Sequence, residues 1–71
     1  MKTKMWRDEY GLTLKQGNII RELIKGFARK IIASNLDIPF NTIGSEFSTI
    51  YEITLAKGHV ALVKWAKERN Y

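Results

Sequence analysis

The stretch Leu36-Asp37-Ile38-Pro39, which holds the only proline of this 71-residue chain, most constrains its fold. Proline disfavours helical backbone at the residue before it and is itself suited to the start of a helix. Apolar residues recur at helical spacing on both sides, so the stretch predicts a tight turn between two helices. A short helix, a turn and a longer helix over residues 28–55 is the order of a helix-turn-helix.

A further helix is predicted before this pair by a capping box at its start. The Thr13 hydroxyl can accept a hydrogen bond from the Gln16 amide, while the Gln16 side chain reaches back to the Thr13 amide. Apolar residues then follow at helical spacing, and Gly26 stands where a helix end needs a positive φ. We therefore expect a helix from Leu14 to Lys25.

The remaining elements are also predicted to be helical. The second helix should span residues 28–35 and turn inward Ile31, Ile32 and Leu36. The third should begin at Pro39, with an apolar stripe of Phe40, Ile43, Phe47, Ile50 and Tyr51. After a break at Lys57-Gly58, a fourth from His59 to Arg69 should bury some combination of Val60, Leu62, Val63 and Ala66. Because no strand-like alternation of useful length appears, the predicted class is an all-α, four-helix domain.

The first eleven residues lack a clear period, so we expect a flexible basic arm before a domain at residues 12–71. Its aromatic residues Trp6 and Tyr10 are expected to fold back onto the domain rather than to contact a ligand. No apolar run is long enough for a signal peptide or a membrane span, which predicts a cytoplasmic protein. With no cysteine and one histidine, neither a disulfide nor a metal site is expected, and no cofactor or small-molecule ligand.

The charge balance suggests an anionic partner, yet the cations avoid the third helix. Twelve Lys and Arg against seven Asp and Glu give a net charge of +5, while residues 41–53 contain neither Lys nor Arg. The polar side of that helix carries short side chains that can hydrogen-bond base edges. The sequence alone fits a DNA contact and an ordinary solvated face equally well.

From Leu12 to Ala66, without a gap, the chain resembles the LuxR-type (GerE-like) helix-turn-helix DNA-binding domain. The resemblance rests on LTLKQ, on GFARKIIASNLDIPFNTI, on IYE and on HVALVKWA. No one of these motifs is specific, but the register holds across all four. The resemblance implies a transcription regulator whose third helix enters the major groove of double-stranded DNA, with the fourth helix as a homodimer surface. We expect an activator.

The expected contacts fall into three groups. Phosphate contacts position a protein on DNA, whereas contacts to base edges carry specificity. The residues expected to read bases are Asn41, Gly44, Ser45, Ser48 and Thr49. Those expected to hold phosphates are Lys15, Arg29, Lys30, Thr42, Lys57 and His59. The expected dimer surface consists of Val60, Val63, Lys64 and Lys67, although Val63 also fits a core position.

Some residues depart from the family pattern and keep other functions open. Pro39 replaces the small polar residue that would cap the third helix, and Asn41 or Thr42 could recover part of that cap. Glu46 and Glu52 would repel phosphate, and Glu46 is expected to pair with a cation of the second helix. An alternative is therefore a helix-turn-helix fold that binds another regulator or RNA polymerase. A non-specific nucleic-acid binder is a third hypothesis, and no catalytic motif suggests an enzyme.

Overall fold

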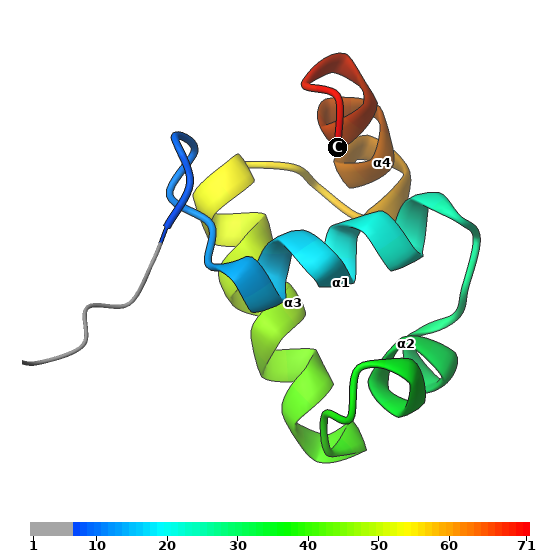
Figure 1. Ribbon diagram of the computed structural model, residues 1–71. Helices are drawn as coiled ribbons and strands as arrows, with labels where there is room; N and C mark the ends of the chain where they lie inside the picture. The colour runs from blue at the N-terminus through cyan, green and yellow to red at the C-terminus, as the bar shows by residue number, and fades with distance from the viewer. Residues whose placement is uncertain (1–6) are drawn as a thin grey trace, which may run out of the picture.

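Four helices make up the structure, a computed structural model that describes residues 7–71. They are α1 (Leu14–Ile24), α2 (Arg29–Asn35), α3 (Phe40–Thr54) and α4 (His59–Glu68), shown in Figure 1. Within the described residues the only strand-like pairing is one isolated bridge between Arg7 and Thr13. The all-α class is confirmed, and the predicted helix ends differ from the observed ones by no more than one residue.

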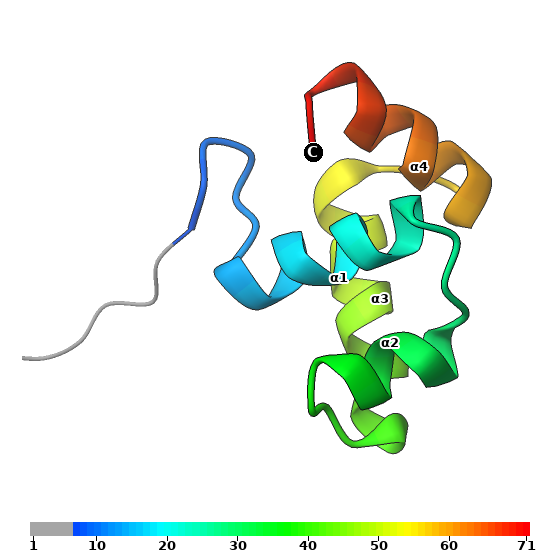
Figure 2. The same cartoon turned by 45° about the vertical axis from the view of Figure 1, so that its right-hand side comes forward.

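The helices cross around one core. α1 packs against α2 and α4, and α3 also packs against α2 and α4. In Figures 1 and 2, α4 lies on one side of α1 and α2 lies on the other. α2, the turn after it and α3 therefore form one corner of the domain, and α3 leaves a long face uncovered.

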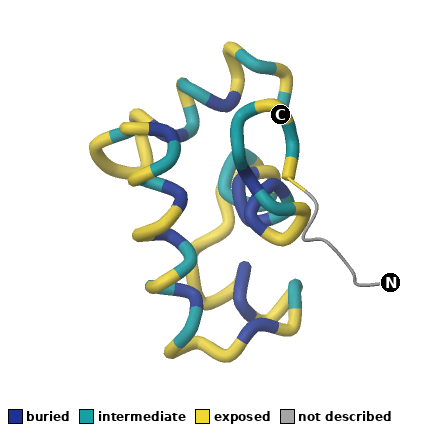
Figure 3. The backbone as a smooth tube through the Cα atoms, turned by 90° about the vertical axis from the view of Figure 1, so that its left-hand side faces the viewer, coloured by how far each residue is buried: buried dark blue, intermediate teal, exposed yellow. Residues whose placement is uncertain are grey.

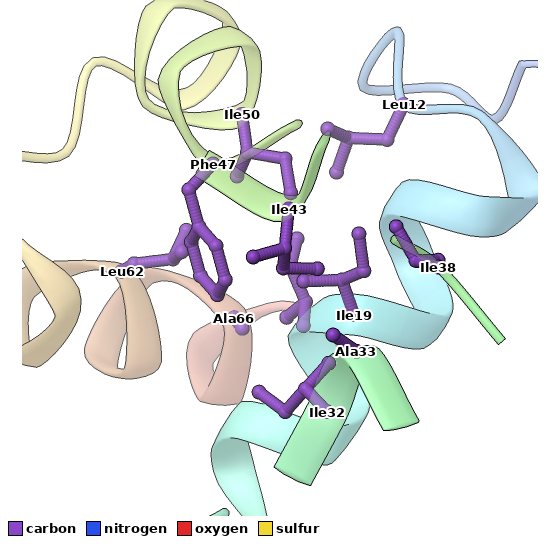
Figure 4. Packing of buried hydrophobic residues seen from close by; sticks show 11 residues of the cluster. Leu12, Ile19, Ile32, Ala33, Ile38, Ile43, Phe47, Ile50, Leu62 and Ala66 are labelled. Carbon is purple, nitrogen blue, oxygen red and sulfur yellow. The ribbon is translucent and has the colours of Figure 1, made fainter. Parts of the chain in front are cut away.

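Isoleucines dominate the core, together with one phenylalanine. The buried apolar residues are Leu12, Ile19, Ile20, Ile32, Ala33, Ile38, Ile43, Phe47, Ile50, Leu62 and Ala66. Figure 4 shows the ring of Phe47 pointing from α3 toward Leu62 and Ala66 of α4. Along the chain, the buried positions recur at helical spacing and leave exposed stretches between them (Figure 3). Each helix thus contributes one face to the core.

The helix ends agree in part with the sequence prediction. Both hydrogen bonds of the capping box at Thr13 form, and Gly26 has a φ of 94°. At the start of α3 no side chain caps the helix, so the expected help from Asn41 or Thr42 is wrong. Leu55, which follows the last residue of α3, has a φ of 62°, a left-handed conformation that favours glycine over leucine.

Two apolar residues predicted to face inward point outward instead. Ile31 is 45% exposed, and α2 buries the consecutive pair Ile32 and Ala33. Phe40, the first residue of α3, is 62% exposed. The helical period ranks positions by angle, but it does not tell how far along a helix its neighbours extend.

Of the arm expected at residues 1–11, residues 7–11 form a turn that packs against the domain. The Asp8 carboxylate accepts hydrogen bonds from the amides of Tyr10 and Leu12, and the Asp8 amide donates to the Leu12 carbonyl. Tyr10 folds back as predicted, with its ring centroid 5.4 Å from that of Trp65. Trp6 and the rest of the arm lie outside the described residues.

The last residue closes this turn from the other end of the chain. The Tyr71 hydroxyl donates a hydrogen bond to the Asp8 carboxylate, and the Arg21 guanidinium lies 5.4 Å from the Tyr71 ring centre. Partial burial acts to raise the pKa of Asp8, but the hydrogen bonds from Tyr71, Leu12 and Tyr10 lower it overall. Burial and the bond to Asp8 raise the pKa of Tyr71. Both directions fit a hydroxyl that donates to a carboxylate.

Removing this hydroxyl should make the domain less stable by about 1 kcal/mol at neutral pH. A lowered carboxyl pKa gives stability that is present above the unfolded pKa and is lost as pH falls through the folded one. The raised Tyr71 pKa adds stability that is lost as pH rises beyond about 10. Tyr71→Phe should therefore unfold earlier in urea at neutral pH and lose less stability in acid than the parent.

Tyr51→Phe is the matched control for this change. Tyr51 is a half-buried tyrosine of α3, and no hydrogen bond of its hydroxyl is found within residues 7–71. Its substitution should leave the dependence of stability on pH unchanged. Equal shifts of the urea midpoint for both variants at every pH would show that the bond to Asp8 adds nothing.

Candidate nucleic-acid interface

The uncovered side of α3 presents a row of short polar side chains. Asn41, Ser45, Ser48 and Thr49 are exposed, and Gly44 is partly exposed among them; we call these five residues the polar face of α3. Steps of four and three residues place Asn41, Ser45 and Ser48 in line. On the other side, Ile43, Phe47 and Ile50 are buried. All five residues expected to read bases therefore lie together on one accessible surface.

Gly44 is not required by packing. Apart from the backbone of its own helix, a Cβ built at this position would meet no atom within 4 Å, and the residue lies inside a regular helix. Glycine in a helix interior costs about 1 kcal/mol relative to alanine. The helix thus carries a local loss of stability on the face where a ligand backbone could approach closely.

Glu46 lies beside the polar face but is already engaged. Its carboxylate is 3.6 Å from the Lys15 Nζ and accepts a hydrogen bond of 3.3 Å from the Gln16 side chain. The prediction that Glu46 pairs with a cation of α2 is wrong, because the start of α1 lies closer. Lys15 partly neutralises this carboxylate and remains exposed. Glu52, in contrast, is exposed in line with Ser45 and Ser48 and adds a negative charge to the surface.

The other residues expected to hold phosphates come from three parts of the fold. Arg29 and Lys30 begin α2, Lys57 belongs to the turn before α4, and His59 is the first residue of α4; all four are exposed. Thr42 is half-buried in the first turn of α3. The Arg29 guanidinium lies 4.5 Å from the centre of the Phe47 ring, so it is held against the core. The exposed side chains of Lys30 and Lys57 are accessible to the phosphates of a nucleic acid bound nearby.

The expected dimer surface is accessible on α4. Val60 is 73% exposed, Lys64 and Lys67 are exposed, and Val63 is half-buried. Steps of four and three residues put Val60, Lys64 and Lys67 on one side of the helix. The core positions of α4 are Leu62 and Ala66. This surface is narrow and mostly cationic.

A groove that the sequence did not reveal lies between the ends of three helices. It has a volume of about 440 Å³ and is lined in part by Leu23, Phe27, Arg29, Phe47 and His59. Two expected phosphate ligands, Arg29 and His59, thus share one concave surface with apolar side chains. The nearest sequence signal is Phe27, a large apolar residue directly after the glycine that ends α1.

Residues 7–71 contain no group of three or more His, Asp and Glu side chains placed to hold a metal ion. Among the helices described, none combines the length and the apolar character that a membrane span requires.

Comparison with known proteins gives no counterpart: no protein-family model, no curated protein and no solved structure matches the chain.

Proposed function

We propose that this chain is a sequence-specific DNA-binding transcription regulator with a LuxR-type helix-turn-helix domain, and that α3 reads the major groove. The polar face of α3 carries the proposal. An amide and three hydroxyl groups are exposed in Asn41, Ser45, Ser48 and Thr49, and such groups pair with base edges. A helix of 15 residues is about 22 Å long, which is enough to follow the groove.

The arrangement of charge supports the same function. Lys30 of α2 and Lys57 of the turn before α4 extend from elements next to α3, where phosphates would flank an inserted helix. Lys15 partly neutralises Glu46 beside the polar face. Positive charge therefore lies on the elements around α3 while the five residues of its polar face are uncharged, as positioning and reading contacts require.

The proposed homodimer would join through α4. Its surface of Val60, Lys64 and Lys67 would bring lysines of two copies together, and such repulsion is weaker at high salt. We therefore expect the free protein to be mostly monomeric at low salt and two copies to assemble on DNA with two half-sites. Two bound copies would double the DNA contact without requiring a stable free dimer.

The test is retention of genomic DNA fragments by the full chain at low and at physiological salt. Selective retention of a few fragments at about 0.15 M salt is expected, with an affinity that falls with a log–log slope near −0.9 for each phosphate contact. Equal and salt-sensitive retention of all fragments would indicate a non-specific binder. No retention at low salt would contradict both specific and non-specific DNA binding, and would favour the alternative that α3 binds another regulator or RNA polymerase. The exposed carboxylate of Glu52 is the observation that favours this alternative.

Gly44→Ala should separate stability from DNA binding. The new methyl group enters open space, so we expect the free energy of unfolding to rise by up to about 1 kcal/mol. On DNA, the same methyl group would stand between the α3 backbone and the base edges. Affinity for a retained fragment should therefore fall by roughly tenfold, measured by fluorescence anisotropy.

Ser34→Ala is the control for this prediction, because Ser34 is an exposed residue of α2 outside the polar face. It should change neither stability nor affinity by much. A Gly44→Ala protein that is more stable and binds DNA as tightly as the parent would remove Gly44 from the interface.

A further inference from the structure

Packing leaves a groove between α1, α2 and α4 that is partly apolar and open to solvent. Phe27, which lies between α1 and α2, is 38% exposed, and Leu23 of α1 is half-buried beside it. Phe47 of α3 closes the groove, and it is 1% exposed. With a volume of about 440 Å³, the groove falls in the size range of ligand sites in proteins. Its volume is sufficient for one large side chain of a partner.

The polar side chains on the walls of the groove are cationic or neutral. Arg29 extends over the Phe47 ring at 4.5 Å, and His59 lines the side formed by α4. No carboxylate lies among the lining residues, and within residues 7–71 neither Arg29 nor His59 takes part in an ion pair. The ring contact orients the guanidinium, and within the described part of the chain its hydrogen-bond donors have no partner.

Further lysines extend this positive rim beyond the groove. Lys30 follows Arg29 and is exposed, and Lys57 precedes His59 by two residues and is also exposed. Lys25 stands next to Gly26 but is 3.5 Å from the Glu22 carboxylate, so part of its charge is compensated. An occupant would therefore meet an apolar floor within a mostly unpaired cationic rim.

These two properties together select the chemistry of the occupant. A DNA backbone matches the rim but offers the apolar floor nothing to bury. A neutral apolar peptide would fill the floor and leave the cations without partners. An acidic segment with a large apolar side chain satisfies both, since carboxylates pair with guanidinium groups and burial of the side chain removes apolar area from water.

We propose that the groove formed by Leu23, Phe27, Arg29, Phe47 and His59 is a docking site for an acidic peptide segment of a partner protein, which inserts an aromatic or aliphatic side chain beside Phe27. This site is distinct from the polar face of α3, because Phe47 lies on the buried side of that helix. It also gives Arg29 and His59 a partner other than phosphate. The assignment does not depend on whether the chain binds DNA.

The test uses synthetic peptides and the full ¹⁵N-labelled chain. One peptide alternates Asp and Glu with Leu and Phe; a second has Ser at every apolar position, and a third has Asn and Gln in place of the acids. Titration with the first should shift the amide resonances of Gly26, Phe27, Ala28 and His59. The serine and amide peptides should each bind roughly tenfold more weakly or worse, because each lacks one half of the recognition.

Substitutions in and outside the groove test whether the peptide binds there. Phe27→Ser and Arg29→Gln should each weaken the first peptide by several-fold, whereas Phe40→Ser should leave its affinity unchanged. Phe40 is the matched control, since it is an exposed phenylalanine outside the groove. The amide spectrum of each variant reports whether it is folded.

Several results would overturn the proposal. One is the absence of any shift at millimolar peptide, and another is a set of shifts confined to other surfaces. Equal binding of the acidic and serine peptides would reduce the site to non-specific charge attraction. If the resonances of the groove residues shift only with protein concentration, the occupant is a second copy of this chain. If they shift with duplex DNA but not with peptide, Arg29 and His59 contact phosphates instead.

Discussion

Phe47→Ala is expected to lower the free energy of unfolding more than any other single substitution proposed for this protein, by about 3–5 kcal/mol. The Phe47 side chain is 1% exposed and points from α3 toward Leu62 and Ala66 of α4, in the middle of the core (Figure 4). Truncation of a buried phenylalanine to alanine costs about 3–5 kcal/mol, through lost burial and the cavity that remains. A domain of 71 residues has a total stability of roughly 4–10 kcal/mol, so this one change removes much of it.

A second phenylalanine of the same helix provides the control. Phe40 is 62% exposed at the start of α3, and its replacement by alanine should change the free energy of unfolding by about 0.5 kcal/mol or less. Urea unfolding followed by circular dichroism gives both values. Similar losses for the two variants would mean that α3 is rotated about its axis from the orientation in which Phe47 is buried and Phe40 exposed.

The start and end of each helix were predictable because interactions between residues close in sequence determine them. The capping box at Thr13, the positive φ at Gly26 and the break at Pro39 each depend on residues close in sequence. Interactions of this kind form with little help from the rest of the chain. The positions of the helix ends therefore followed from the sequence to within one residue.

Which apolar residues of each helix are buried was less predictable, because burial depends on how far the neighbouring elements extend. Ile31 and Phe40 occupy apolar positions of the helical pattern, yet both remain exposed. The bond between Tyr71 and Asp8 joins residues 63 positions apart, and neither residue belongs to a motif. Nothing local marks such a pair.

The candidate sites divide in the same way. The polar face of α3 follows from helical spacing, so the sequence alone predicts that its five residues share one side of the helix. The groove beside Phe27 gathers residues of α1, α2, α3 and the start of α4, and the partner of Glu46 is on α1 rather than α2. Surfaces on one element can be predicted from the period of the sequence, but surfaces shared by several elements cannot.

The proposed DNA-reading function makes its sharpest prediction at two hydroxyl groups of α3. Ser45→Ala combined with Thr49→Ala should reduce the preference for a retained fragment over other genomic DNA by roughly five- to hundredfold. This range corresponds to about 1–3 kcal/mol, the discrimination that good contacts to a base edge provide. Ser45 and Thr49 are both exposed, so no core contact is lost.

The stability and the salt dependence of this double variant distinguish a loss of base recognition from a loss of folding. Alanine is a better helix former than serine or threonine, so its free energy of unfolding should equal or exceed that of the parent. Because hydroxyl groups displace no counterions, the dependence of affinity on salt should also stay the same. A stable variant with unchanged salt dependence and lost selectivity would assign base reading to the polar face of α3, whereas selectivity that survives both substitutions would place the reading surface elsewhere.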